Sequence, residues 1–250
     1  MTRSKKLRRD TLGTIEQLER RQTMSASPSV ALLPGGLLKV TGTSNAETIS
    51  ICRCNYDRSL LIARLGVGSG RELGRWNIHA VTSIDASMGS GNDRLDIDFG
   101  NTGSLNAVKV NMGTGSNEEV RVTGTSLQTL DLDAKASVNT TLRITSATIA
   151  SRAFADFGSG HGNDRVHVSY SHVQNLRLAM GNGDDHVTLD RSSVGGAAVD
   201  MGAGDRDIFS TFKSSIASGT VDGGPGRRDE FSGPRFQGVR FTNFEIVPRA

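Results

Sequence analysis

The sequence predicts an all-β fold, a single-stranded, right-handed parallel β-helix (a solenoid) of about nine coils over residues 31–250. Three observations predict it. A glycine-led motif recurs every 21 to 24 residues, apolar residues alternate between the motifs, and no convincing helical periodicity follows residue 30. One coil of this length cannot bury its own apolar face, so the core must form by stacking coils on one another.

The period is measured from one glycine in each copy of the motif, which in most copies follows a bulky residue. These anchor glycines are Gly42, Gly66, Gly89, Gly113, Gly158, Gly181, Gly202 and Gly224. Their steps are 24, 23, 24, 45, 23, 21 and 22 residues, and the step of 45 spans two periods. The missing copy falls at residues 132–135, where the alternation continues without glycine. We therefore expect the coils to run from near Val40 to near Ile246.

Each unit is expected to contain two or three short strands. Leu176, Leu178 and Met180 alternate before one glycine corner, and Val187 and Leu189 alternate after it. The same alternation is found at Val108, Val110, Met112, Leu130, Leu132, Val166, Val168 and Tyr170. A period of two indicates a strand with one buried face.

The corners and the last coil have expected roles as well. The glycines supply positive φ, and the Asn and Asp residues beside them tolerate left-handed backbone and bond their own main chain. The Met, Phe or Leu before each anchor is expected to stack as an inward ladder. The last coil, residues 236–247, is expected to close the core with Phe241, Phe244 and Ile246.

Charge and composition exclude several classes of function. Residues 1–25 carry seven Lys/Arg and three Asp/Glu, whereas the other 225 residues carry 22 and 23, so the net charge of +3 belongs to the N-terminal segment. The repeats show no basic, aromatic-interleaved face, so no nucleic acid partner is expected. No apolar run approaches 18 residues, so no transmembrane segment is expected. Cys52 and Cys54 are expected to be half-buried strand residues.

Residues 1–30 differ from the repeats and are expected to form a basic leader that is disordered or a short helix. They have a basic start but no apolar stretch of the length that a secretory signal needs. The segment Glu16-Gln-Leu-Glu-Arg-Arg-Gln-Thr-Met-Ser-Ala-Ser resembles the E-x-L-E-x-R-x-x-L-S-A leader of many exported planctomycete proteins, with Met24 in place of Leu. The resemblance implies an extracellular or cell-surface location.

An acidic residue follows most glycine corners, one spacer before an apolar residue. Residues 89–95, Gly-Ser-Gly-Asn-Asp-Arg-Leu, are similar to the hemolysin-type (RTX) calcium repeat G-G-x-G-x-D-x-U-x, with Met88 in the first glycine position. The resemblance implies calcium held between adjacent coils by turn carbonyls and carboxylates. The candidate ligands for calcium are Asp93, Asp164, Asp185, Asp207 and Asp229.

A metal-free ladder of Asx-type turns is the alternative at the same corners. This chain has one motif per coil, whereas the RTX repeat has one per half-coil, and the spacing from glycine to acid varies from four to six residues. Arg94, Arg165, Arg206 and Arg228 also lie close enough in sequence to neutralise the acids.

The enzyme alternative is a carbohydrate-active β-helix, either a lyase or a hydrolase. Residues 160–162, Gly-His-Gly, and 183–185, Gly-Asp-Asp, resemble polygalacturonase motifs, but their order is reversed and both lie inside repeat corners. No nucleophile elbow or phosphate loop is present. The sequence therefore favours a non-enzymatic structural or adhesive solenoid, with calcium and a surface polysaccharide or protein as its expected partners. A metal-free structural spacer remains the other alternative.

Overall fold

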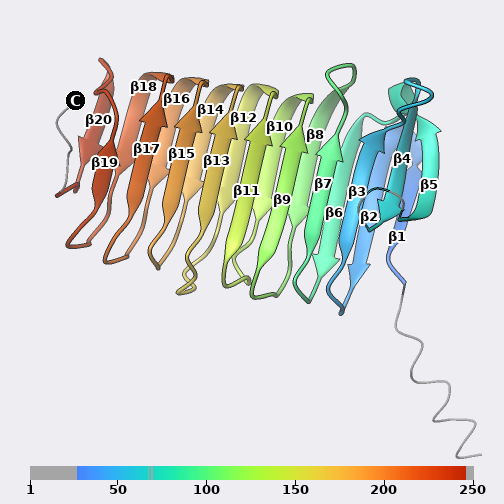
Figure 1. Ribbon diagram of the computed structural model, residues 1–250, viewed down its shortest axis with the longest axis horizontal. Coiled ribbons are helices and arrows are strands. Elements are labelled where there is room, and N and C mark those ends of the chain that lie inside the picture. The colour runs from blue at the N-terminus through green and yellow to red at the C-terminus, as the bar shows by residue number, and fades with distance from the viewer. Residues whose placement is uncertain (1–26, 67, 69, 246–250) are drawn as a thin grey trace, which may run out of the picture.

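The computed structural model describes residues 27–66, 68 and 70–245. The chain winds as a β-solenoid of about seven turns, and this confirms the predicted fold class. Each turn contributes one strand to each of two ten-stranded sheets, which face each other across the core (Figure 1). The strands of each sheet lie side by side along the whole length of the molecule.

The first sheet contains β1 and the even-numbered strands except β4. In spatial order these are β1 (Ser29–Leu33), β2 (Leu37–Thr43), β6 (Ser83–Gly89), β8 (Ser104–Asn111), β10 (Ser126–Asp133), β12 (Thr148–Asp156), β14 (His172–Ala179), β16 (Ser193–Asp200), β18 (Ser215–Asp222) and β20 (Val239–Thr242). The short 3-10 helices η1 (Pro34–Gly36) and η2 (Ile78–Ala80) lie in connections near the N-terminal end.

The second sheet contains the remaining strands. From the C-terminal end they are β19 (Glu230–Ser232), β17 (Ile208–Phe212), β15 (His186–Asp190), β13 (Arg165–Ser169), β11 (Thr140–Thr145), β9 (Glu118–Thr123), β7 (Arg94–Asp98), β3 (Thr48–Arg53), β4 (Leu60–Leu65) and β5 (Arg71–Asn77). Apart from the pairs at the N-terminal end, all strand pairs of both sheets are parallel.

The core is a set of inward rows that run from coil to coil. Val108, Leu130, Ala153, Leu176 and Ala197 are successive partners in the first sheet, and all five are buried. The predicted ladder before the anchor glycines is also buried: Met88, Met112, Phe157, Met180 and Met201 are at most 1% exposed. Because equivalent residues align, each coil buries its apolar face on the next.

The prediction of nine coils is wrong at the N-terminal end. Residues 60–65 and 71–77 form a pair of antiparallel strands, β4 and β5, which extends the second sheet beyond β3. The glycine at position 66 therefore belongs to a hairpin and not to a solenoid corner. β1 folds back on β2, again antiparallel, and contacts β5. These strands cover the first coil, seen at the blue end of Figure 1.

The glycine corners require glycine because the coils approach closely there. Gly202 has φ of 85°, and a Cβ at this position would lie 1.7 Å from the carbonyl oxygen of Gly181 in the preceding coil. Gly224 repeats this relation with the carbonyl oxygen of Gly202, again at 1.7 Å. A side chain would force neighbouring coils apart.

Aromatic residues gather at the C-terminal end of the core, as predicted. The ring centroids of Phe231 and Phe241 are 4.2 Å apart, and Phe244 lies 6.1 Å from Phe231. Ile246 and Val247 lie outside the described residues, as does the predicted leader up to residue 26. Strand β1 already begins at Ser29, inside the range predicted as leader.

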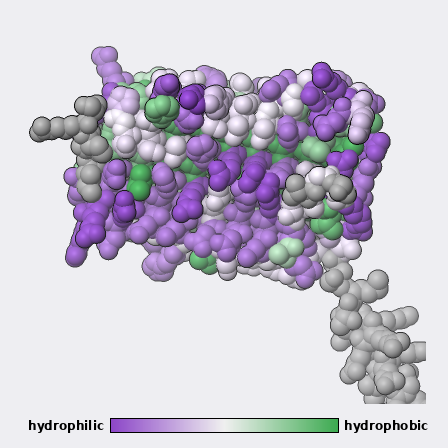
Figure 2. Space-filling model, viewed as in Figure 1, coloured by the Kyte–Doolittle hydropathy of each residue, from purple (hydrophilic) through white to green (hydrophobic). Residues whose placement is uncertain are grey.

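Two further predictions concern single residues. The alternation places Tyr170 on the inward face with Val166 and Val168, but strand β13 ends at Ser169 and the following turn exposes 55% of Tyr170. Cys52 and Cys54 are half-buried free thiols, as expected, but Cys54 follows strand β3 and does not belong to it. The molecular face in Figure 2 is mostly hydrophilic, with hydrophobic residues in small patches. Among the described residues, no helix is long and apolar enough to span a membrane.

Candidate functional site: a buried carboxylate ladder

The predicted calcium ligands lie at one corner of the solenoid, each in a different coil. Asp93, Asp164, Asp185, Asp207 and Asp229 each stand immediately before a strand of the second sheet. The parallel register stacks these positions: Arg165 pairs with His186, and His186 pairs with Ile208, so the acids before them are neighbours. The structure therefore brings the five residues into one row.

A hydrogen bond links each acid to the next coil. The backbone N–H of Asp164 donates to Asp185 Oδ1 at 2.7 Å, that of Asp185 donates to Asp207 Oδ1 at 2.7 Å, and that of Asp207 donates to Asp229 Oδ1 at 2.9 Å. Each carboxylate thus accepts from the backbone of the coil before it. Such bonds tie successive coils together at a corner where the backbone has left the sheet.

Three glutamates extend the same row and were absent from the predicted ligand set. Glu47 N donates to Asp93 Oδ1 at 2.8 Å, Asp93 N donates to Glu118 Oε2 at 3.0 Å, and Asp229 N donates to Glu245 Oε2 at 2.8 Å. We call the row of Glu47, Asp93, Glu118, Asp164, Asp185, Asp207, Asp229 and Glu245 the carboxylate ladder. The motif itself could have identified Glu47 and Glu118, which occupy the acid position of their coils.

The ladder is interrupted in the coil that lacks the glycines. Thr140 takes the acid position there, and its N–H donates to Asp164 Oδ1 at 2.6 Å. Thr140 has no carboxylate to accept the N–H of Glu118 in the coil before it. Glu118 N donates instead to the backbone oxygen of Asn139. The degenerate repeat therefore divides the carboxylate ladder into two segments.

Several ladder acids lie deep in the corner and carry an incomplete set of partners. Asp93 and Asp185 are 1% exposed, and Asp207 and Asp229 are 0% exposed. The second oxygens of these four residues, Oδ2, and Oε1 of Glu118 are buried without a hydrogen-bond partner. A buried ionised carboxylate with an unsatisfied oxygen is costly, so the neutral acid is favoured.

Burial shifts the acid equilibrium of these groups strongly. It raises the pKa of Asp93 to about 6, of Glu118, Asp164 and Asp207 to about 7, and of Asp185 to about 8. The pKa of Asp229 is also raised by burial. The backbone N–H donors oppose the rise in every case, while the charges of neighbouring ladder acids add to it in all of these groups except Asp164.

The arginines next to the acids in sequence do not neutralise them. Arg94 turns outward and pairs with Asp96 at 2.7 Å and with Glu119 at 3.5 Å. Arg121 and Arg143 extend this exposed network through Glu119. Within the described part of the chain, no ion pair reaches a ladder acid.

The fit of calcium to this corner can be judged from the donor set. Calcium takes 6–8 oxygen ligands. Each ladder acid has one oxygen turned toward a backbone N–H, which is a donor and repels a cation. Over residues 27–66, 68 and 70–245, no three His, Cys, Asp or Glu side chains are grouped so that they could hold a metal ion. What remains for calcium is the row of unpartnered second oxygens.

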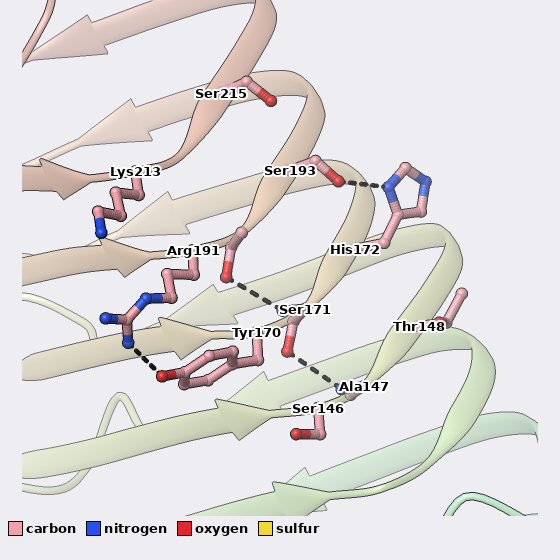
Figure 3. Close-up of a pocket in the computed structure, with 11 residues that line it drawn as sticks. Ser146, Ala147, Thr148, Tyr170, Ser171, His172, Arg191, Ser193, Lys213 and Ser215 are labelled. Atoms are coloured by element: carbon pink, nitrogen blue, oxygen red, sulfur yellow. Dashed lines mark hydrogen bonds between the residues drawn. The ribbon is translucent and has the colours of Figure 1, made fainter.

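The opposite corner, between the second and the first sheet, contains a ladder of serines. Ala147 N donates to Ser171 Oγ at 3.1 Å and Ser171 N donates to Ser192 Oγ at 3.1 Å (Figure 3). In the next coil, Ser192 N donates to Ser214 Oγ at 3.0 Å. Each hydroxyl also donates to the carbonyl oxygen two residues earlier in its own coil. This serine ladder of Ser171, Ser192 and Ser214 is fully bonded and holds no charge.

Comparisons with family models, with curated proteins and with solved structures each return no match.

Proposed function

We propose that this chain is a non-catalytic structural β-solenoid that works outside the cell, as a rigid scaffold or adhesive element. The observation that carries the proposal is the carboxylate ladder. The motif acids that resemble metal ligands or catalytic residues lie inside the corner, where their carboxylates accept hydrogen bonds from the backbone of the neighbouring coil. The resemblance of residues 16–27 to an export leader supports the extracellular location.

The position of the acids argues against catalysis by the corner motifs. Asp185, the second acid of the Gly-Asp-Asp segment, is 1% exposed and cannot touch a polysaccharide. Asp184 beside it is exposed, and its carboxylate accepts the N–H groups of Asp205 and Arg206. Neither acid has the free, facing partner that glycoside hydrolysis needs.

A shallow groove on the outer face of the first sheet is the other place where carboxylates gather. Its lining includes Asp131, Asp156, Lys135 and Arg152. Arg152 Nη2 lies 2.6 Å from Asp131 Oδ1, and Lys135 Nζ lies 3.1 Å from Asp156 Oδ2. Both acids are engaged by cations, so neither is the free carboxyl group that general acid catalysis needs.

The buried acids of the ladder with raised pKa values, such as Asp93, Asp185 and Asp207, favour the protonated form. A protonated carboxyl carries no charge, which removes both the cost of burying an ionised group and the repulsion between coils. Calcium binding by Asp93, Asp164, Asp185, Asp207 and Asp229 is the second candidate. It is favoured by the unpartnered oxygens of Asp185, Asp207 and Asp229, which lie on consecutive coils. In that case calcium would stabilise the folded solenoid.

Thermal unfolding of the full chain separates these alternatives. It is measured at pH 5 and pH 8, each with millimolar calcium, magnesium or chelator. If the ladder carboxyls are protonated, the Tm should be higher at pH 5 than at pH 8, and calcium should not change it. A calcium ladder predicts a rise in Tm at pH 8 with calcium alone, about 2.7 kcal/mol of stability at a hundred times the dissociation constant. Asp185→Asn should abolish that rise.

Two further measurements test the rest of the proposal. Incubation with polygalacturonate and with neutral β-glucans should release no reducing ends and no unsaturated products. Release of either would show a carbohydrate-active enzyme and refute the non-catalytic part. Fractionation of the source cells should find the chain outside the cytoplasmic membrane, and a purely cytoplasmic signal would refute the location.

A further inference from the structure

An exposed group of aromatic and cationic side chains lies on the turns that join the second sheet to the first. Tyr170 is 55% and Phe212 54% exposed. The guanidinium carbon of Arg191 lies 5.1 Å from the ring centroid of Tyr170 and 5.7 Å from that of Phe212. Lys213 Nζ lies 5.2 Å from the Phe212 centroid. We call these four residues the aromatic–cation column.

The column is built on consecutive coils. Tyr170, Arg191 and Lys213 follow β13, β15 and β17, and Figure 3 shows them one above another along the solenoid. Arg191 Nη1 also donates to the Tyr170 hydroxyl. The guanidinium is therefore held between two rings and a hydroxyl, so its position on the surface is fixed.

The backbone under the column is in an unusual conformation for such side chains. Tyr170, Arg191 and Lys213 have φ of 50°, 47° and 49°. The two preceding coils place Gly124 and Ser146 at this turn, which are small. A bulky residue in the left-handed region costs free energy, and such cost is characteristic of functional sites. Three consecutive coils have such a residue in the left-handed region, at the turns that carry the exposed aromatic and cationic side chains.

The surface beside the column is hollowed and lined with hydroxyls. A shallow pocket of about 560 Å³ includes Tyr170 and Arg191 together with Thr148, Ser193 and Ser215. Ser193 Oγ is 2.8 Å from His172 Nδ1, so the imidazole is part of the same hydroxyl-rich rim. The pocket therefore offers neutral hydrogen-bonding groups next to fixed cations.

The charge of this surface is positive. Asp190 is the acid paired with Arg191, at 3.7 Å from Nη1. Lys213 takes part in none of the ion pairs found among the described residues. Its ammonium group remains available to an anion from outside. By contrast, Arg94, Arg121 and Arg143 on the second sheet are all paired with acids.

We infer that the aromatic–cation column binds an acidic polysaccharide, a chain of sugar units that carry carboxylate or sulfate groups. Arg191 presents the planar donor fork that suits such anions, and Lys213 adds a second cation one coil away. Coils are about 4.8 Å apart, which is comparable to the length of one sugar unit. The serine and threonine hydroxyls suit the hydroxyls of the sugar ring.

Nucleic acid fits the same surface less well. Single strands need free aromatic faces on which bases stack. Here the guanidinium of Arg191 covers faces of both rings, and the ammonium of Lys213 lies over Phe212. A duplex needs many phosphate contacts, and the column supplies two cations. Polysaccharide binding by the column goes beyond the proposed structural role, and a negative result for binding would leave that role unaffected.

The test measures binding of the full chain to polygalacturonate, to dextran sulfate and to neutral dextran by affinity electrophoresis. We expect binding to at least one of the two acidic chains and none to neutral dextran. The double variant Arg191→Asn/Lys213→Asn should weaken that binding about tenfold or more. Asn adopts this conformation elsewhere in the chain, at Asn101 and Asn243, so the variant should fold with an unchanged or higher Tm.

The matched control removes the same two charges from the first sheet, as Lys109→Asn/Arg177→Asn. Every variant keeps the basic residues 1–25, so binding to that segment is common to all. The control should bind within about twofold of the wild type. Equal weakening in both double variants would overturn the inference. So would equal binding to neutral dextran, or tighter binding to duplex DNA or to phosphatidylglycerol vesicles than to the acidic polysaccharides.

Discussion

The backbone N–H of Asp164 donates to Oδ1 of Asp185 at 2.7 Å, across the boundary between two coils. The same carboxyl group has a second oxygen that is buried without a partner. One side chain therefore both bonds neighbouring coils and introduces an unfavourable charge when it ionises. Stability of the solenoid should depend on which of these effects is removed.

Asp185→Ala and Asp185→Asn separate the two effects. Alanine leaves the buried N–H of Asp164 without an acceptor, which costs about 1–3 kcal/mol at any pH. Asparagine keeps an acceptor oxygen and cannot ionise, so at pH 8 we expect it to retain the stability of the wild type or exceed it. Urea unfolding at pH 8 measures the difference. An Asn variant as unstable as the Ala variant would show that the ionised carboxylate is required.

The wild-type chain should lose stability as the pH rises from 4 to 8. Five acids of the ladder have pKa values raised from a usual 3.8 or 4.5 to about 6 to 8, so the folded state holds protons that the unfolded state has released: Asp93, Glu118, Asp164, Asp185 and Asp207. Their stabilisation is complete below pH 4 and is lost as the pH passes through the folded pKa values. A difference of one between the folded and the unfolded pKa of a group corresponds to about 1.4 kcal/mol.

One histidine acts in the opposite sense on this pH profile. Burial lowers the pKa of His186, so its contribution to stability grows as the pH rises through 6.5. Six acids with raised pKa values act against it, so the net slope should stay negative. Denaturant midpoints between pH 4 and pH 9 check the sign. The variant Asp185→Asn/Asp207→Asn should flatten the curve, and a wild-type curve that rises with pH would refute the protonated ladder.

Alanine at an anchor glycine should separate two coils. A Cβ on Gly202 would lie 1.7 Å from Gly181 O, and the left-handed φ alone costs about 1–3 kcal/mol. We therefore expect Gly202→Ala to lower Tm strongly. Gly160→Ala is the matched control within a corner, because its Cβ would lie 3.4 Å from Ser137 O. It should change stability by less than about 0.5 kcal/mol. Similar losses in both variants would contradict the close approach of coils.

The serine ladder should contribute to stability without a pH dependence. Ser192→Ala removes the acceptor of Ser171 N–H in a buried corner, with an expected cost of about 1–3 kcal/mol. Ser193→Ala, one residue later on the surface, should cost less than about 0.5 kcal/mol. Calorimetry at pH 5 and pH 8 should give the same loss for Ser192→Ala at both. A loss confined to one pH would assign the effect to a charged group instead.

Much of the fold followed from the sequence because a solenoid repeats short-range rules. The steps between anchor glycines set the length of a coil, and the alternation of residues such as Leu176 and Leu178 set the inward face. Both signals are local, since strand alternation and positive φ act within a few residues. The degenerate copy at residues 132–135 could be located for the same reason, from its place in the period.

Tertiary structure decided what those residues do. The glycine at position 66 fits the period, but strands β4 and β5 pair antiparallel and cover the first of the described coils. The nine predicted coils are therefore about seven. The acids of the motif became a buried ladder with raised pKa values only because stacking placed each beside the N–H of the coil before it. Similarly, Tyr170, Arg191 and Phe212 meet only across coils, more than twenty residues apart in sequence. The sequence determines the coil, whereas contacts between coils, which depend on register, determine burial, charge and surface chemistry.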